Sequence, residues 1–335
     1  MKLPELSRTR ILVTNDDGIH APGLEALIEI ATQLSSDVWV VAPEFNQSGA
    51  GHSLSIVNPI RARQHSHGQA QVTPADIARK RILVTNDDGI NAPGLEAMID
   101  IATQLAKDVW VVAPEYNQSG AGHSLSLSHP VRARQLTETK HALEGTPTDC
   151  VLFAVKHLLK DHKPDIVLSG VNRGGNMSDD VTYSGTIAGA MEGCLLGIPS
   201  IAFSQSYTHP HPVKWDTATQ FGADVARRVL AMDMPRNVLV NVNFPDIAAA
   251  NVKGVRVTRQ GVRGFGGHIV ERTDPRGGSY YWIAYAPGEH EHDDESDLTS
   301  VRSGYVSVTP LHLDLTHEAT RRKLAAQFAA PVKSD

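Results

Sequence analysis

Residues 84–94 read VTNDDGINAPG, and the elements on either side of this stretch decide the fold that we expect. The apolar segment 81–85 predicts a strand, and residues 86–89 (NDDG) predict a turn after it. Apolar residues recur at helical spacing over 93–105, and residues 108–114 (DVWVVAP) are apolar enough for a strand buried on both faces. A strand, a helix and a second strand joined by short loops predict a βαβ unit.

The same stretch occurs twice in the chain. Residues 13–20 read VTNDDGIH, and residues 10–64 align without gaps on 81–135 with 10 differences in 55 positions. Solenoid proteins need at least three units, so two near-identical copies at an offset of 71 indicate a tandem duplication. We expect the organisation to be a duplicated partial βαβ copy, a polar linker and one complete domain, over 1–64, 65–80 and 81–335.

Only the second copy is followed by the further elements that such a sheet needs. Residues 146–149 (TPTD) predict a helix, reaching about residue 159, with Thr at its N-cap and Pro at its first position. A helix rich in small residues is expected over 184–196. Strands are expected over 164–170, 198–204, 238–244, 254–259 and 304–310. The alternation predicts an α/β fold with a Rossmann-like, doubly wound, mostly parallel sheet, and the loop-rich segment 260–299 predicts a hairpin or arm.

Composition excludes several classes of protein. The net charge of −6 is unfavourable for a surface that binds a nucleic-acid polymer, since phosphate backbones are bound by clustered Lys and Arg. No apolar run is long enough for a membrane span, and the N-terminal residues lack the apolar core of a signal peptide. Cys150 and Cys194 have no metal or redox spacing and are interpreted as buried thiols. We therefore expect a cytoplasmic protein.

Oxygen-bearing side chains follow three of the expected strands. They are Asp87 and Asp88, then Asn117 and Ser119, then Asn172 and Asn176. Open α/β sheets bind ligands beyond the carboxyl ends of their strands, so these side chains are expected to converge. Neither Cys nor a pair of His is among them, and ligation by oxygen alone favours Mg²⁺, Mn²⁺ or Ca²⁺ over zinc.

Groups suited to an anion stand next to these side chains. The candidates are the glycines of two loops, Gly120, Gly122, Gly174 and Gly175, whose N–H groups are accessible, and Ser184-Gly185-Thr186 at the start of a helix. A hard cation beside an anion cradle fits hydrolysis of a phosphate ester, in which a metal polarises a phosphoryl oxygen and activates water.

Each feature also has a purely structural interpretation. The NDDG segment alone is a turn, residues 119–124 (SGAGHS) could be a flexible loop, and Gly174-Gly175 could serve only to avoid steric clashes. The functional interpretation depends on compatible ligand types occurring at three independent strand ends.

Six motifs in order resemble the SurE survival-protein nucleotidases over residues 81–316. They are VTNDDGINAPG (84–94), VVAPEYNQSGAGHSLS (111–126), GTPTDCV (145–151), VLSGVNRGGNMSDDVTYSGTIAGAMEG (167–193), NVNFP (241–245) and GYVSVTPL (304–311). The first copy resembles only the opening portion of that family.

The resemblance implies a metal-dependent 5′/3′-nucleotidase that dephosphorylates nucleoside monophosphates and, in some members, short polyphosphate. It implies one divalent ion per subunit, Mg²⁺ or Mn²⁺, held by Asp87, Asp88, Ser119 and Asn172. With the loop residues above, the expected phosphate contacts are Asn117, Gly120, Gly174, Gly175, Asn176, Ser184, Gly185 and Thr186, and the expected catalytic residues are Asp87, Asp88 and Asn176.

The resemblance also bears on assembly. It implies a homodimer or homotetramer in which the segment 260–299 is exchanged between subunits. Asp297 falls where the family has an acidic residue before its GYVS strand, in a segment that aligns poorly.

The first copy has no complete set of partners in its own sequence. Asp87 lies 58 residues before Gly145, as in ordinary members, whereas Asp16 lies 129 residues before it. The first copy has Ser48 but no equivalent of GTPTDC or SGVNRGGN, so we expect one complete site per chain.

Two other interpretations are open. The duplicated copy could disrupt the site and leave a non-enzymatic protein that binds nucleotide or metal. An aspartyl-phosphate phosphatase with Asp87 as nucleophile is disfavoured, because those enzymes use Asp-x-Asp and the acids here are adjacent.

Overall fold

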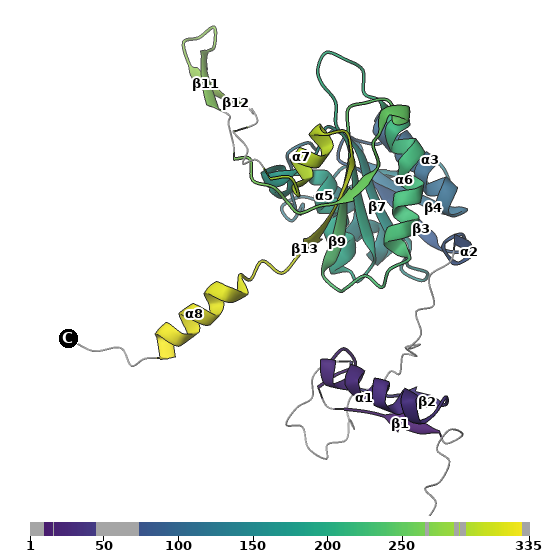
Figure 1. The fold of residues 1–335 in the computed structure, drawn as a ribbon. Helices are drawn as coiled ribbons and strands as arrows, with labels where there is room; N and C mark the ends of the chain where they lie inside the picture. The colour runs from purple at the N-terminus through teal and green to yellow at the C-terminus, as the bar shows by residue number, and fades with distance from the viewer. Residues whose placement is uncertain are drawn as a thin grey trace, which may run out of the picture. The chain divides into compact units, whose positions relative to one another are not determined.

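The computed structural model describes residues 10–15, 17–44, 74–264, 268–284, 288 and 293–329. The chain divides into two compact units, Met1–Ala70 and Gln71–Asp335 (Figure 1). The expectations for Asp16, for Ser48 and for most of the linker segment fall outside the described residues.

The smaller unit contains a single βαβ arrangement. Strand β1 (Ile11–Val13) pairs in parallel with β2 (Val38–Val40), and helix α1 (Pro22–Leu34) connects them. The apolar face of α1 consists of Leu24, Ile28 and Ala31, which are buried and pack against Val13 of β1. The described part of the first copy therefore folds locally as its sequence pattern predicts.

The larger unit is built on a nine-stranded sheet with the order β10-β13-β9-β8-β7-β3-β4-β6-β5. The strands are β3 (Arg81–Thr85), β4 (Asp108–Pro114), β5 (Ala133–Gln135), β6 (Lys140–Leu143), β7 (Ile166–Arg173), β8 (Ser200–Gln205), β9 (Val238–Phe244), β10 (Val255–Val257) and β13 (Val306–His312). Neighbours from β6 to β9 are parallel, while β5 and β13 are antiparallel to β6 and β9. The predicted doubly wound, mostly parallel sheet is confirmed, and the second copy provides its β3 and β4.

Helices cover both faces of this sheet (Figure 1). Helices α3 (Pro93–Leu105) and α6 (Trp215–Leu230) pack on the face that includes Ile82 and Val84, and α4 (Pro147–Phe153) packs on the face that includes Leu83. Helix α5 (Gly185–Leu195) packs beside α4. Because successive strand residues point to opposite faces, β3 is buried from both sides. The carboxyl ends of β3, β4 and β7 therefore meet at one edge between these helical layers.

The structure also contains elements that the sequence patterns did not indicate. Helices α6, α8 (Glu318–Ala329) and α2 (Pro74–Ile77) were not expected, and α2 lies in the segment expected to be a linker, with Ile77 buried. The helix expected to reach residue 159 is α4 followed by a π-helical turn over Ala154–Leu158. Short 3₁₀ turns cover Ser178–Thr182 and Ala249–Asn251.

The segment expected to form an arm is only partly a hairpin. Strands β11 (His268–Thr273) and β12 (Ser279–Ala284) pair antiparallel and are largely exposed to solvent. Helix α7 (Asp297–Arg302) belongs instead to the body of the unit, because Asp297, Leu298 and Ser300 are buried.

Equivalent residues of the two copies differ greatly in burial. Leu12 is 63% exposed and its equivalent Leu83 is fully buried, and Ile30 is 55% exposed while Ile101 is fully buried. The second copy is covered by α4, α6 and the neighbouring strands, whereas the described part of the first copy contains only β1, α1 and β2. Context, and not local sequence, therefore decides how much apolar surface each copy buries.

The helix glycines of the two copies offer a matched test of this difference. A Cβ at Gly94 would lie 1.9 Å from the carbonyl oxygen of Val171 and 2.9 Å from the Trp215 ring, whereas a Cβ at Gly23 would meet nothing within 4 Å. We expect Gly94→Ala to lower the free energy of unfolding by at least about 1–3 kcal/mol, as overpacking does. Gly23→Ala is expected to be neutral or stabilising by up to about 1 kcal/mol. Urea unfolding followed by circular dichroism measures the change in stability for both variants. Equal effects of the two substitutions would contradict the difference in packing between the two copies.

Candidate active site

The turn after β3 forms in the same way in both copies. The Asn86 amide Nδ2 donates a 3.0 Å hydrogen bond to the Gly89 carbonyl oxygen, and Asn15 makes the same 3.0 Å bond to Gly18. Both glycines are in the left-handed region, with φ of 104° and 105°. The turn is thus a local property of the NDDG sequence and does not distinguish the copies.

Asp87 is distinguished by its contact with the N-terminus of α5. The Thr186 hydroxyl donates a 2.5 Å hydrogen bond to Asp87 Oδ1, and a Cβ at Gly185 would lie only 2.7 Å from the Asp87 Cβ. Asp87 is 4% exposed. Burial raises its pKa to about 6, assisted by the charge of Asp88 and opposed by the Thr186 hydrogen bond. The carboxylate is therefore enclosed, and a nearby cation would stabilise its charged form.

Asp88 connects the same turn to the end of β7. Its Oδ2 accepts a 2.9 Å hydrogen bond from the backbone N–H of Arg173. Burial raises the pKa of Asp88, and the Arg173 N–H and guanidinium oppose that effect. Burial thus disfavours the charged form of both neighbouring carboxyl groups, and a bound cation would stabilise that form. The described residues include no cluster of three or more His, Cys, Asp or Glu, so other ligands would have to be neutral oxygens.

The loop after β4, residues 115–128, is the glycine-rich loop. The Gln118 N–H donates a 2.7 Å hydrogen bond to the Asp87 carbonyl oxygen, which joins this loop to the β3 turn. Asn117 Oδ1 accepts a 2.8 Å bond from the Ser119 N–H. The structure thus brings Ser119, an expected metal ligand, onto a loop bonded directly to Asp87, while the Asn117 side chain is engaged in folding that loop.

Asn172 lies at the end of β7, immediately before Arg173. Its Nδ2 donates a 3.0 Å hydrogen bond to the carbonyl oxygen of Gly174, and Gly174 has a φ of 125° that favours glycine. The Oδ1 atom of Asn172 is the one that could bind a hard cation, since an amide binds metals through its oxygen.

Asn176 lies apart from these contacts, in a buried network at the ends of β8 and β9. Its Nδ2 donates to Ser204 Oγ at 2.8 Å, and its backbone N–H donates to Asn243 Oδ1 at 2.8 Å. Asn241 Nδ2 donates to the Asn176 carbonyl oxygen at 2.8 Å. These contacts fix the turn that contains Gly175, and they explain the two Asn side chains of the NVNFP motif, which sequence reasoning left without a role.

The first residues of α5 have folding roles of their own. The Ser184 hydroxyl caps the helix by accepting a 3.0 Å bond from the Ile187 N–H. Gly185 and Thr186 contact Asp87, so all three residues expected to bind phosphate surround the helix N-terminus. Such a terminus favours an anion through its free N–H groups and dipole.

Side chains outside the expected set hold the glycine-rich loop. Asp149 forms a capping box with Thr146, the predicted N-cap, and also accepts bonds from the Ser126 N–H at 3.0 Å and the Ser126 hydroxyl at 2.7 Å. His123 Nε2 lies 3.1 Å from Glu192 Oε2 of α5. The TPTD pattern indicated the N-cap at Thr146. Nothing in the sequence indicated that Asp149 bonds Ser126 or that His123 contacts Glu192.

Asp297 is a buried junction between distant segments. It accepts hydrogen bonds from the N–H groups of Ser178 at 2.9 Å and Gly261 at 3.0 Å. Burial raises its pKa and these hydrogen bonds oppose the effect. Its contacts place it next to the 3₁₀ turn that precedes α5, so its evident role is to hold that turn.

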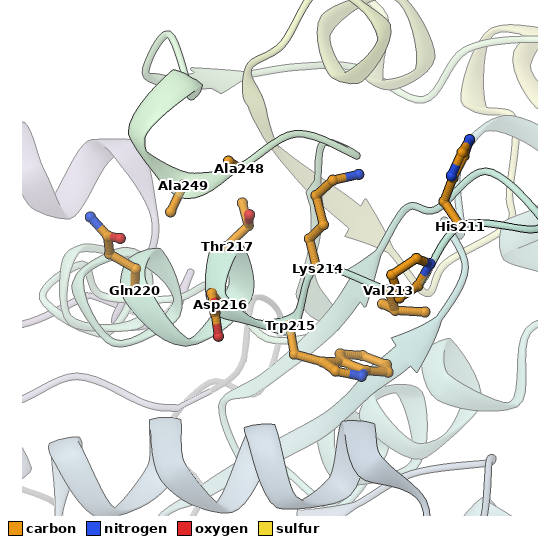
Figure 2. A pocket seen from close by; sticks show the side chains of 10 residues that line it. His211, Val213, Lys214, Trp215, Asp216, Thr217, Gln220, Ala248 and Ala249 are labelled. Carbon is orange, nitrogen blue, oxygen red and sulfur yellow. The ribbon is translucent and has the colours of Figure 1, made fainter.

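A pocket of about 590 Å³ lies between the segments that follow β8 and β9 (Figure 2). It is lined by the start of α6 and by Ala248 and Ala249, and none of the expected site residues lines it. Two of its polar side chains already have partners: Lys214 pairs with Asp246 at 2.5 Å, and Thr217 donates to the Ile247 carbonyl oxygen. We therefore place the functional site at the ends of β3, β4 and β7.

Comparison with known proteins identifies the family to which the chain belongs. The fold and the oxygen-lined strand ends define a Rossmann-like α/β protein with a paired-carboxylate site. The family model described as "Survival protein SurE" matches residues 11–79 and 82–266. The chain belongs to the SurE family and is an enzyme of that family.

Individual relatives cover most of the chain. The protein named 5′-nucleotidase SurE of Paramagnetospirillum magneticum is 54% identical over 254 residues, which is 76% of this chain and 98% of the relative. That of Caulobacter vibrioides is 52% identical over 244 residues, which is 72% of this chain and 93% of the relative. The crystal structure of the SurE protein from Aquifex aeolicus aligns with a TM-score of 0.65 and 39% identity, covering 74% of this chain and 99% of that one.

Removing the Asp149 carboxylate tests the anchor of the glycine-rich loop. Burial raises the pKa of Asp149, but hydrogen bonds from Thr146 and Ser126 outweigh it and hold the pKa below its ordinary value. The stabilisation is therefore present above the unfolded-state pKa and is lost as the pH falls through the folded-state value. Near neutral pH, Asp149→Asn is expected to cost about 1 kcal/mol, as loss of a helix cap does.

Urea unfolding between about pH 7 and pH 3 measures this dependence, because the ordinary Asp pKa of about 3.9 lies within that range. The difference between the wild type and Asp149→Asn should shrink as the pH falls. Asp100→Asn, at an exposed position of α3, is the control and should show no such trend. A cost of Asp149→Asn that is the same at both ends of the range would be evidence against the anchor.

Proposed function

We propose that the protein is a divalent-metal-dependent nucleotidase that hydrolyses nucleoside 5′- and 3′-monophosphates to nucleoside and phosphate. The observation that carries the proposal is the enclosure of Asp87 between Asp88 and the N-terminus of α5. A carboxylate pair suited to a cation thus lies against a helix terminus suited to an anion. Relatives at 52–54% identity are named 5′-nucleotidases, which supports the nucleotide as the phosphate ester.

The donor set fits a hard divalent ion, Mg²⁺ or Mn²⁺. The residues that would hold it are Asp87, Asp88, Ser119 and Asn172, which come from three segments joined by direct hydrogen bonds. All four offer oxygen. When bound, the ion polarises a phosphoryl oxygen and activates water for in-line attack. The raised pKa values of both acids are consistent with carboxylates that are built to face a cation.

The protein's own groups orient the phosphate. The residues proposed for this role are Asn117, Gly120, Gly174, Gly175, Asn176, Ser184, Gly185 and Thr186. Backbone N–H groups at the start of α5 would donate to phosphate oxygens, as helix N-termini do. Gly185 is required there because any Cβ would collide with Asp87. Asn176 would act from the rigid turn that β8 and β9 hold in place.

The proposed partners follow from the same family membership. Substrates are nucleoside monophosphates and short polyphosphate, and the assembly is a homodimer or homotetramer. The β11–β12 hairpin and α8 are largely solvent-exposed in the single chain, as segments that pack on another subunit would be. Among the described residues, no helix is long and apolar enough to cross a membrane.

Phosphate release from AMP and GMP tests the activity. We expect release to require added Mg²⁺ or Mn²⁺, to stop with EDTA and to return when the metal is restored, because the acids alone supply no Lewis acid. Absence of metal-stimulated release under conditions in which a SurE relative acts would refute the function.

A pair of substitutions tests which copy carries the site. Asp87→Asn removes a carboxylate from the proposed metal site and is expected to lower kcat/KM by at least about a hundredfold. Loss of a residue that only supports a metal ligand already lowers activity by up to about a hundredfold. Asp16→Asn, at the equivalent position of the first copy, is expected to leave kcat/KM within about twofold, since the first copy has no equivalent of GTPTDC or SGVNRGGN to complete a site. Steady-state kinetics with AMP measure both values of kcat/KM. Equal losses of kcat/KM in the two variants would show that both copies contribute to the active site.

A further inference from the structure

His123 and Glu192 join the glycine-rich loop to α5. His123 Nε2 lies 3.1 Å from Glu192 Oε2, and the Glu192 side chain is only 11% exposed. A carboxyl group so enclosed is costly unless it has a hydrogen-bonding or charged partner. His123 is the side-chain hydrogen-bonding partner that the described structure gives to Glu192.

The pair is connected to the site through α5. The same helix begins at Gly185 and Thr186, which contact Asp87. Next to His123, a Cβ at Gly122 would lie 3.7 Å from the Thr182 carbonyl oxygen, so the loop lies along the segment leading into α5. The loop therefore follows the helix from the site to Glu192.

Ser119 lies between two attachments of this loop. On one side, Gln118 donates to the Asp87 carbonyl oxygen at 2.7 Å, and on the other side is the His123–Glu192 contact. Between them, Gly120 and Gly122 adopt left-handed φ values of 81° and 56°. A Cβ at Gly120 would meet nothing within 4 Å, so packing does not fix the loop at that point. Glycines have the greatest conformational freedom to lose, so the part of the loop between Gln118 and His123 depends on the attachments at its two ends.

We propose that His123 is a positioning residue whose contact with Glu192 holds the glycine-rich loop so that Ser119 is presented to the metal and phosphate site. The role of Ser119 rests on the proposed function, whereas the restraint on the loop does not. Partners that orient metal ligands typically contribute tenfold to a hundredfold to metal affinity or activity.

The first copy supplies the matched control. His52 occurs in the same local sequence, Gly-His-Ser, but nothing that follows the first copy corresponds to Glu192 before the second copy begins. The variants are His123→Ala, Glu192→Gln, their combination, the conservative His123→Gln and the control His52→Ala, all in the full chain. Three quantities are measured: hydrogen–deuterium exchange of a peptide covering 115–128, Mn²⁺ affinity by calorimetry, and kcat and KM for AMP.

We expect His123→Ala to accelerate exchange in the loop peptide and to weaken Mn²⁺ affinity and kcat/KM by about tenfold to a hundredfold. His123→Gln, whose amide can still donate to Glu192, should recover part of the loss. The double variant should be no worse than the worse single variant, because both remove one contact. His52→Ala should match the wild type in all three measurements.

The proposal is overturned if His123→Ala leaves loop exchange equal to that of His52→Ala. It is also overturned if exchange rises throughout the larger unit with a lower melting temperature, which would indicate a merely structural role. Hydrogen exchange requires no turnover, so it decides the role of His123 separately from the AMP assay, on which the proposed function depends.

Discussion

The contact between Asp87 and the start of α5 is the constraint on which the rest of the site depends. Thr186 donates a 2.5 Å hydrogen bond to the carboxylate, and Gly185 approaches so closely that no side chain would fit. This contact fixes the spacing between the end of β3 and helix α5. The same contact helps to bury the Asp87 carboxyl group. Burial is the largest cause of the raised pKa of Asp87, which is about 6.

The duplication separates local folding from the formation of a site. Both copies form the same Asn-to-Gly hydrogen bond and the same parallel pair of strands. Among the described residues, it is the second copy that has β7 paired beside β3 and α5 against its turn. The described residues of the first copy remain a βαβ unit with exposed apolar side chains such as Leu12 and Trp39. The enclosed acidic site at Asp87 therefore requires β7 and α5, which come from later in the chain.

Much of the fold could be predicted from the sequence because its signals are local. Buried parallel strands read as continuous apolar runs, and the TPTD segment encodes its own capping box with Thr146 and Asp149. The strand-end residues followed from the general geometry of open sheets. Helix α6 was not predicted, because most of the residues that it buries, such as Ala218, Gly222 and Ala226, are small and give a weak apolar pattern.

The remaining features depend on pairings across long separations. His123 and Glu192 are 69 residues apart, and Ser178 and Asp297 are 119 residues apart. Nothing in either local sequence indicates its partner, since a lone His or Asp on a loop is compatible with many environments. For the same reason the sequence did not indicate the partners of Asn176. Its amide donates to Ser204 on β8, and its backbone bonds the side chains of Asn241 and Asn243 on β9. A single sequence identifies the residue types, and only the fold assigns their partners.

The central claim is that one chain contains one complete metal site. Its most direct test is the stoichiometry of Mn²⁺ binding to the full chain, measured by isothermal titration calorimetry beside the fragment 71–335. One ion per chain should bind, with the same affinity in both proteins. Two equivalent ions per full chain, or loss of binding in the fragment, would contradict it.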